Sequence, residues 1–138
     1  MRSTLLLLTT LIAVTGSLVA KNGNPEEQVD VLFKQLTSEK RSTALQDFFA
    51  DSLALAQKPA EVRAMDAKAE AAWSFYGPPA SYEILERREI GKSLYRLRWL
   101  TKNKDETPLF WSALFYKRAN KWEALNLIFI DQPEKAGI

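Results

Sequence analysis

Residues 82–130 decide the fold, and they read YEILERREIGKSLYRLRWLTKNKDETPLFWSALFYKRANKWEALNLIFI. Branched and aromatic residues dominate this stretch, as is typical of β-strands, and short polar segments interrupt it. We predict strands at residues 82–90, 93–101 and 108–117, and from 121 or 122 to 130. Because the connections between these strands are short, successive strands should pair antiparallel in one sheet.

The residues before this stretch predict helices. Asn24 can cap a helix that begins at Pro25, and Glu27 lies three residues after the cap, as in a capping box. Two further helices are expected at residues 42–56 and 59–75. The sequence therefore predicts an α+β fold in which N-terminal helices pack on a curved antiparallel sheet of about four strands.

The pairing of the strands predicts which side chains face the helices. If Ala119-Asn120 is the last turn and Thr101 pairs with Pro108, then Phe110 lies between Trp99 and Phe129. A slip of one residue would turn every side chain of a strand to the other face, so this choice determines the interior. The predicted inner face then comprises Tyr95, Leu97, Trp99, Phe110, Leu114, Tyr116, Leu125, Leu127 and Phe129.

The opposite face of the predicted sheet mixes apolar and basic side chains, among them Arg96, Arg98, Trp111 and Ile128. Arg98 is expected across from Trp111, an arrangement suited to a cation–π contact. Two interpretations remain open. Aromatic residues and arginine are enriched at interfaces, which favours a homodimer contact on this face. Alternatively, the face is a partly covered surface where long side chains lie over tryptophan.

Residues 1–20 have the order of a secretory signal peptide, with a positive charge, then an uncharged apolar run, then small residues before the first lysine. Cleavage is predicted after Ala20. Residues 21–138 would then form a single domain with a polar tail from about residue 131. The predicted location is secreted or periplasmic, with no membrane attachment after cleavage; an uncleaved N-terminal anchor is the alternative.

The composition excludes several kinds of chemistry. Among 138 residues there is no cysteine and no histidine, which rules out disulfides, thiolate ligands, a cysteine nucleophile and Ser-His-Asp triads. The acidic residues lack the spacing of known metal sites, and no glycine-rich phosphate loop occurs, so we expect no metal and no cofactor. Glutamates lie among the basic residues, and the net charge is only +2, so no nucleic-acid partner is expected.

The order of helices followed by an antiparallel sheet resembles the NTF2-like superfamily. The sequence marks that carry the resemblance are WSFYG at residues 73–77, YEIL at 82–85 and KWEAL at 121–125. The chain is most similar in pattern to small exported members without an assigned activity. The resemblance implies a cone-shaped fold, a pocket between helices and concave sheet, and frequent dimers through the convex sheet. Functions in the superfamily range from small-molecule binding to isomerisation and dehydration, and fold alone does not choose among them.

Our leading hypothesis is a non-enzymatic exported domain, because the predicted concave face is aromatic and a catalytic set is missing. Its ligand would be a small apolar or amphipathic molecule, or a protein partner. The predicted cleft is lined by Trp73, Tyr76, Tyr95, Trp99, Phe110 and Phe129.

Two alternatives come from other classes. The first is an isomerase or lyase in which Asp66, on the flank of an apolar helix stripe, acts as base and a tyrosine hydroxyl donates a hydrogen bond. Against it, the position of Asp66 favours a partly exposed aspartate that pairs with a neighbouring arginine or lysine. The histidine on which dehydratase-like members rely is also absent. The second alternative is an interaction or scaffold protein that dimerises through the face that carries Arg96 and Arg98.

Overall fold

The computed structural model describes residues 23–138, so the predicted signal peptide at 1–20 lies outside the described residues. The helices come first: α1 (Pro25–Leu36), the 3₁₀ helix η1 (Glu39–Thr43), α2 (Ala44–Phe48), α3 (Leu53–Gln57) and α4 (Pro59–Tyr76). The strands follow: β1 (Ser81–Ile90), β2 (Leu94–Lys102), β3 (Pro108–Arg118) and β4 (Lys121–Ile130), with 3₁₀ helices η2 (Lys104–Glu106) and η3 (Pro133–Ala136). In residues 23–138, no helix combines the length and apolarity that a bilayer crossing requires.

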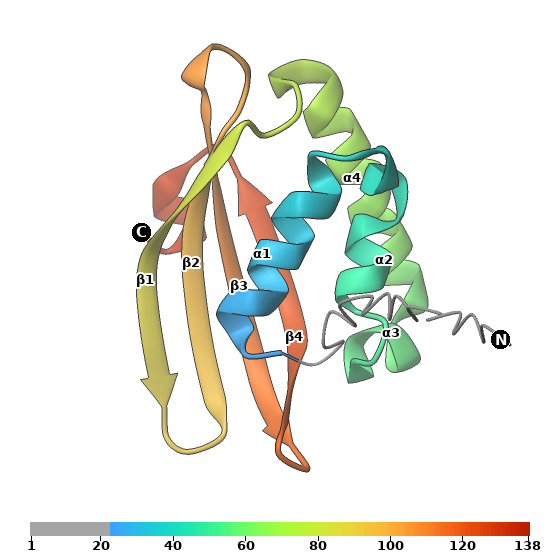
Figure 1. Ribbon diagram of the computed structural model, residues 1–138, viewed down its shortest axis with the longest axis vertical. Helices are drawn as coiled ribbons and strands as arrows, with labels where there is room; N and C mark the ends of the chain where they lie inside the picture. The colour runs from blue at the N-terminus through green and yellow to red at the C-terminus, as the bar shows by residue number, and fades with distance from the viewer. Residues whose placement is uncertain (1–22) are drawn as a thin grey trace, which may run out of the picture.

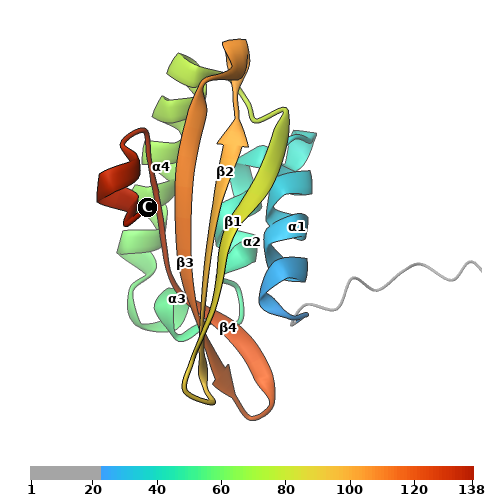
Figure 2. The ribbon, with the colours of Figure 1, turned by 90° about the vertical axis from the view of Figure 1, so that its left-hand side faces the viewer.

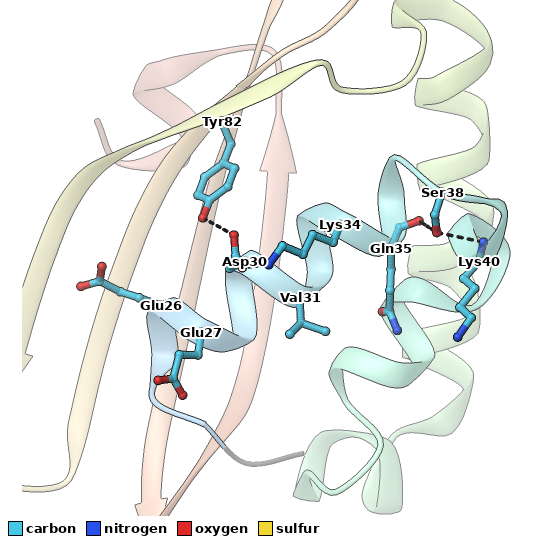
Figure 3. Close-up of a pocket in the computed structure, with 9 residues that line it drawn as sticks. All are labelled: Glu26, Glu27, Asp30, Val31, Lys34, Gln35, Ser38, Lys40 and Tyr82. Carbon is cyan, nitrogen blue, oxygen red and sulfur yellow. Dashed lines mark hydrogen bonds and ion pairs between the residues drawn. The ribbon is translucent and has the colours of Figure 1, made fainter. Parts of the chain in front are cut away.

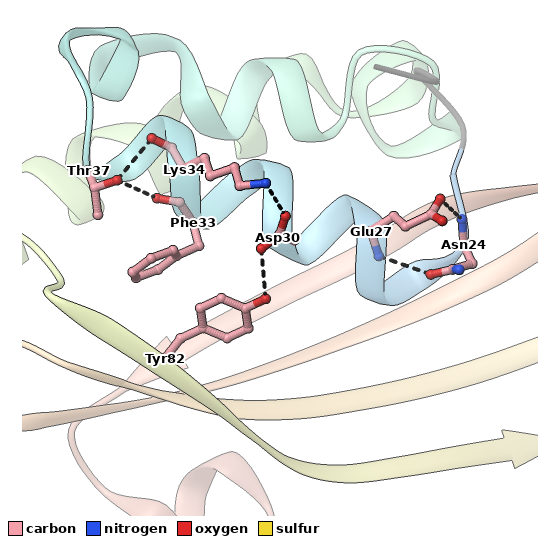
Figure 4. Close-up of polar contacts among 7 residues, drawn as sticks. All are labelled: Asn24, Glu27, Asp30, Phe33, Lys34, Thr37 and Tyr82. Atoms are coloured by element: carbon pink, nitrogen blue, oxygen red, sulfur yellow. Dashed lines mark hydrogen bonds and ion pairs between the residues drawn. The ribbon is translucent and has the colours of Figure 1, made fainter. Parts of the chain in front are cut away.

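Helix α1 begins where the sequence predicts. The amide of Glu27 donates to Asn24 Oδ1 at 3.0 Å, and the amide of Asn24 donates to Glu27 Oε2 at 3.1 Å (Figure 4). This reciprocal capping box satisfies amides that have no partner inside the helix. Val29, Leu32 and Leu36 are the buried stripe that holds the helix on the sheet.

The single helix predicted at residues 42–56 is wrong, because the structure divides this region into η1, α2 and α3. Helix α2 ends at Phe48, and Ser52 starts α3 by accepting a hydrogen bond from the amide of Leu55 at 3.3 Å. Serine competes with the helical backbone in this way, and periodicity alone does not reveal it. Helix α4 runs as expected and ends at Tyr76, with Gly77 as its cap; the φ of 72° at Gly77 favours glycine.

The four strands form one antiparallel sheet in the order β1-β2-β3-β4, as expected. Ala119 and Asn120 form the turn between β3 and β4, both with positive φ, as a type I′ turn requires. Figures 1 and 2 show α1 across one face of the curved sheet and η3 on the opposite face. The α+β architecture is therefore confirmed.

The register of β3 differs from the predicted one. Lys102, rather than Thr101, pairs with Pro108, and a bulge at the Leu114/Phe115 step shifts the partners on β4. Trp111 therefore lies between Trp99 and Phe129, where Phe110 was expected. Two local irregularities, a β2–β3 loop one residue shorter than predicted and a bulge, each move the pairing by one residue, and no hydrophobic pattern encodes them.

As a consequence, the two faces of β3 are exchanged relative to the prediction. Trp111, Ala113 and Phe115 are completely buried against the helices, whereas Phe110, Leu114 and Tyr116 point to the outer face and are half-buried. Leu125, predicted inward, is the extra residue of the bulge. Trp99, Leu97, Leu127 and Phe129 face inward as expected.

Four rings form what we call the aromatic stack: Trp73 of α4, Trp99 of β2, Trp111 of β3 and Phe129 of β4. The Trp111 ring centroid lies 6.0 Å from that of Trp73, 5.7 Å from that of Trp99 and 4.8 Å from that of Phe129. The Trp111 indole N–H donates to Thr101 Oγ1 at 2.9 Å, so the buried nitrogen is satisfied. This stack is the centre of the core at the α4 side of the sheet.

Candidate functional site

The structure brings together only three of the six residues predicted to line one cleft. Trp73, Trp99 and Phe129 pack on one another through Trp111 in the aromatic stack. All three side chains are buried. Phe110 lies on the outer face of the sheet.

The two tyrosines of the predicted cleft lie elsewhere. The Tyr76 hydroxyl, at the surface, donates to Asp131 Oδ2 at 2.6 Å. Tyr95 lies near the opposite end of β2 from the stack, with its ring centroid 6.0 Å from that of Trp122 in an edge-to-face contact. Of the predicted cleft residues, only Tyr95 lines one of the two grooves described next.

The first groove, which we call the α1 groove, has a volume of about 940 Å³ and runs along the exposed side of α1. Figure 3 shows its side chains, with Tyr82 reaching from β1 toward Asp30. The residues that line it are Glu26, Glu27, Asp30, Val31, Lys34, Gln35, Ser38, Lys40 and Tyr82.

A short polar chain crosses the α1 groove. The Tyr82 hydroxyl donates to Asp30 Oδ1 at 3.0 Å, and Lys34 Nζ lies 2.6 Å from Asp30 Oδ2 (Figure 4). The hydrogen bond from Lys34, joined by that from Tyr82, lowers the pKa of Asp30. Burial, together with the bond to Asp30, raises the pKa of Tyr82. Phe33 packs on the Tyr82 ring with centroids 4.7 Å apart and holds it in place.

The second groove, which we call the aromatic groove, has a volume of about 500 Å³ and lies between the start of α1 and the inner face of the sheet. It is lined by Asn24, Pro25, Glu26, Glu27, Glu89, Tyr95 and Trp122. Gln28 Nε2 donates to the Trp122 carbonyl at 2.8 Å, which fixes α1 to β4 beside the groove. Three of its lining residues are glutamates, and none of the lining residues within the described range 23–138 is basic.

The three glutamates of the aromatic groove differ in their partners. Arg87 holds Glu26 with two hydrogen bonds of 2.6 and 3.1 Å, and Glu27 belongs to the capping box. Glu89, which pairs across the strands with Tyr95, makes no ion pair with any residue in the described range 23–138. Glu89 is therefore the one glutamate of the three that has no ion-pair or capping partner among the described residues.

The pKa values of Glu26 and Tyr95 in this groove are shifted in opposite directions. The hydrogen bond from Arg87 lowers the pKa of Glu26. Burial and the neighbouring charge of Glu26 raise the pKa of Tyr95. The carboxylate is thus ionised and the phenol protonated at pH 7.

Sequence reasoning missed Glu26, Glu89 and Trp122. The predicted strands at 82–90 and 93–101 leave a two-residue turn, which places Glu89 opposite Leu94, whereas the observed turn through 91–93 places it opposite Tyr95. The bulge in β1 between Ile84 and Glu86 then determines which charged side chains face inward. That bulge has no signature in the hydrophobic pattern.

Asp66, the predicted base, lies on α4. Its Oδ2 accepts a hydrogen bond from Gln46 Nε2 of α2 at 2.9 Å, in exposed surroundings. It lines neither the α1 groove nor the aromatic groove. Its catalytic role stays a prediction.

The predicted dimer face is divided by the new register. Arg96, Arg98 and Ile128 lie on the outer face, and Ile128 is 46% exposed. Trp111, expected beside them, is instead on the inner face, and Arg98 pairs with Glu86 rather than with an indole. The dimer itself stays a prediction. Within residues 23–138, the acidic residues form no group of three that could hold a metal ion.

Comparison with known proteins assigns the fold. No family model matches the sequence, and no curated protein matches it. Among solved structures, the chain is similar to the crystal structure titled "Putative NTF2-like transpeptidase" from Campylobacter jejuni, with a TM-score of 0.56. The fold is NTF2-like. The match covers 74% of this chain and 97% of that chain at 18% sequence identity, so the NTF2-like likeness concerns architecture alone.

Proposed function

We propose that this NTF2-like chain is a non-catalytic binding domain whose aromatic groove takes an amphipathic ligand with a cationic head group. The observation that carries the proposal is the contact of Tyr95 with Trp122 in a groove whose lining, within residues 23–138, has three glutamates and no basic side chain. Aromatic faces attract cations, and a carboxylate beside them adds to the attraction. The apolar part of the ligand would cover the two rings.

A contact within the protein supports this preference for a cation. Lys117 Nζ lies 5.7 Å from the centroid of the Trp122 ring, within the range of a cation–π contact. Glu89 supplies a charge that neither a cap nor an ion pair in the described residues consumes. A ligand ammonium or guanidinium could pair with the Glu89 side chain.

The same groups argue against proton-transfer catalysis. A general acid or base works best with a pKa near the operating pH, whereas the shifts here lower the pKa of Glu26 and Asp30 and raise the pKa of Tyr82 and Tyr95. The sequence has neither cysteine nor histidine, and the Ser-x-x-Lys motif of penicillin-binding proteins does not occur in it.

The test uses dodecyltrimethylammonium below its micelle concentration, with tryptophan fluorescence as the readout. We expect saturable binding that is weakened about threefold by Glu89→Gln, because one exposed charge contact is lost. Trp122→Phe should remove most of the fluorescence change. Glu39→Gln, on exposed η1, is the matched control and should leave binding unchanged.

Neutral dodecyl maltoside defines the outcome that would overturn the proposal. If the neutral and the cationic amphiphile bind equally, and Glu89→Gln changes neither, the groove has no preference for a cation. Binding that survives Trp122→Phe with its full fluorescence change would place the ligand outside the aromatic groove.

Export is a separate proposal, and it rests on the sequence pattern of residues 1–20. The mature protein would begin at Lys21 and act outside the cytoplasm, where a domain without cysteines does not depend on redox conditions. The intact mass of the protein recovered from its native source measures the cleavage site directly. A mass that includes residues 1–20 would contradict the proposal.

A further inference from the structure

The outer face of the sheet has a small cavity of its own, which we call the outer-face cavity. It has a volume of about 220 Å³ and lies where η3 packs on β3 and β4, on the side of the sheet opposite α1 (Figure 2). Its lining is Arg96, Arg98, Ser112, Leu114, Asn126, Ile128, Lys135, Ala136 and Gly137. None of these residues lines the aromatic groove.

The charge of this cavity is positive. Arg96 and Arg98 come from β2 and Lys135 from η3, and among the described residues no carboxylate side chain lines the cavity. Glu86 neutralises Arg98, but within residues 23–138 neither Arg96 nor Lys135 makes an ion pair. Arg88 lies directly opposite Arg96 on the neighbouring strand, and like charges in such a pair repel. A bound anion would relieve this repulsion.

The polar groups of the cavity are suited to donate hydrogen bonds. Arg98 Nε is buried and has no acceptor among the described residues. Asn126 Oδ1 already accepts from the amide of Leu114 at 3.0 Å, so the side chain has its Nδ2 left to donate. The Ser112 hydroxyl adds a further group that can donate. A buried donor without an acceptor costs free energy, and Asn126 and Ser112, which line the cavity, can donate to an oxyanion in it.

The position of Arg98 is fixed by its surroundings. Gly137, with a φ of 75°, lies so close that a Cβ there would be 2.8 Å from an Nη of Arg98. Glu86 Oε2 accepts from Nη1 on the other side. The guanidinium is thus held between η3 and β1, and ordering it costs a ligand no further entropy.

We infer that the outer-face cavity is a binding site for a small tetrahedral oxyanion of the phosphate or sulfate class. The combination of positive charge, unused donors and a preorganised guanidinium matches such an ion. The absence of a carboxylate from the lining argues against a cationic or metal ligand. This inference does not depend on the proposed function, because the two sites lie on opposite faces of the sheet.

The test is a titration of the ¹⁵N-labelled full-length protein with inorganic phosphate at constant ionic strength. The Nε–Hε signal of Arg98, assigned by its loss in Arg98→Lys, is expected to shift in a saturable manner. Sodium chloride at the same ionic strength should not shift it. If phosphate leaves this signal unmoved, or if chloride moves it equally, there is no oxyanion site.

Variants localise the effect. Arg96→Gln and Lys135→Gln should each weaken phosphate binding about fivefold, since each removes one charge from the lining. Arg63→Gln on exposed α4 is the matched control and should bind phosphate as the unmodified protein does. If Arg63→Gln weakens phosphate binding equally, the effect comes from the net charge of the protein and not from the cavity, and the inference is overturned.

A second arm identifies the source of the oxyanion. Phosphatidylglycerol vesicles present the same group as part of a lipid headgroup, and sedimentation with the vesicles measures binding. Vesicle binding lost in Arg96→Gln, together with a phosphate-induced shift at Arg98, assigns a headgroup as one source. A shift at Arg98 without vesicle binding assigns a free oxyanion. Vesicle binding that persists in Arg96→Gln, without any shift at Arg98, contradicts the site.

Discussion

The two ends of the inner face use the same kinds of side chain for different purposes. On β2, Trp99 and Tyr95 point to the same face, yet Trp99 is buried in the aromatic stack and Tyr95 lines the aromatic groove. Likewise on β4, Phe129 is buried in the stack, whereas Trp122 lies half-exposed in the groove. The residue type does not decide between core and site.

The helix that lies above each end makes the difference. Trp73 of α4 covers the stack with an apolar ring. The first turn of α1, which covers the groove, carries Glu26 and Glu27, as helix starts commonly do because acidic groups there complement the helix dipole. Charged groups cannot close over aromatic rings without losing their hydration, so this end stays open. A stabilising feature of α1 thus also gives the groove its charge.

The largest effect on stability is expected at the end of the inner face that holds the aromatic stack, which we call the closed end. Trp111→Ala removes the central ring of the aromatic stack and should lower the free energy of unfolding by about 4 kcal/mol, measured by urea denaturation. Phe110→Ala is the matched control, since it changes the neighbouring residue on the half-exposed face and should cost about 1 kcal/mol. A larger cost for Phe110→Ala would mean that the register with Phe110 inward is correct.

A smaller effect on stability is expected when the hydroxyl group of Thr101, beside the aromatic stack, is removed. Thr101 accepts from the Trp111 indole at 2.9 Å and donates to Asn103 Oδ1 at 2.9 Å. Thr101→Val keeps the shape but leaves two buried groups without a partner, which should cost about 2 kcal/mol. In Trp111→Phe the indole N–H is already gone, so Thr101→Val should cost about 1 kcal/mol less in that background. Identical costs in both backgrounds would show that this hydrogen bond does not stabilise the closed end.

The smallest effect on stability is expected at the end of the inner face that holds the aromatic groove, which we call the open end. It is measured by changing the pH. The pKa values of Glu26 and Asp30 are lower in the folded chain than in the unfolded chain, mainly through Arg87 and Lys34. Their stabilising contribution is therefore complete above about pH 5 and lost as the pH falls through the folded pKa values. Thermal unfolding between pH 6 and pH 3 measures this loss.

Arg87→Gln sharpens the pH experiment. It removes the partner of Glu26, so the variant should lose less stability on acidification than the unmodified protein. Arg63→Gln, on exposed α4, serves as the control and should keep the original pH dependence. An unchanged pH dependence in Arg87→Gln would mean that the Arg87–Glu26 pair does not stabilise the open end.

Sequence reasoning was successful where the signal is local. The capping box at Asn24, the extent of α4 and the Ala119-Asn120 turn all follow from neighbouring residues, and each is confirmed. Reasoning failed where an irregularity of one residue intervenes. The register of β3, and with it the exchange of Phe110 for Trp111 in the interior, depended on a loop length and a bulge.

The candidate site was predicted only in part, because its residues come from segments that are far apart in the sequence. Tyr95 was expected in a binding site and lines the aromatic groove, but its neighbours there come from α1, β1 and β4. Glu26 and Trp122 are far apart in the chain, and no periodicity relates them. Contacts between distant segments depend on how the helices pack on the sheet, and local sequence patterns do not specify that packing.

By itself, the sequence determined that helices precede a four-stranded antiparallel sheet and that chemistry based on cysteine or histidine is absent. Those facts follow from residue types and from spacings of a few positions. Only the tertiary structure decided which aromatic rings close the core and which remain accessible. The physical reason is that the sheet's alternation turns a one-residue shift into an exchange of faces, while the helix above each end supplies either an apolar ring or a charge.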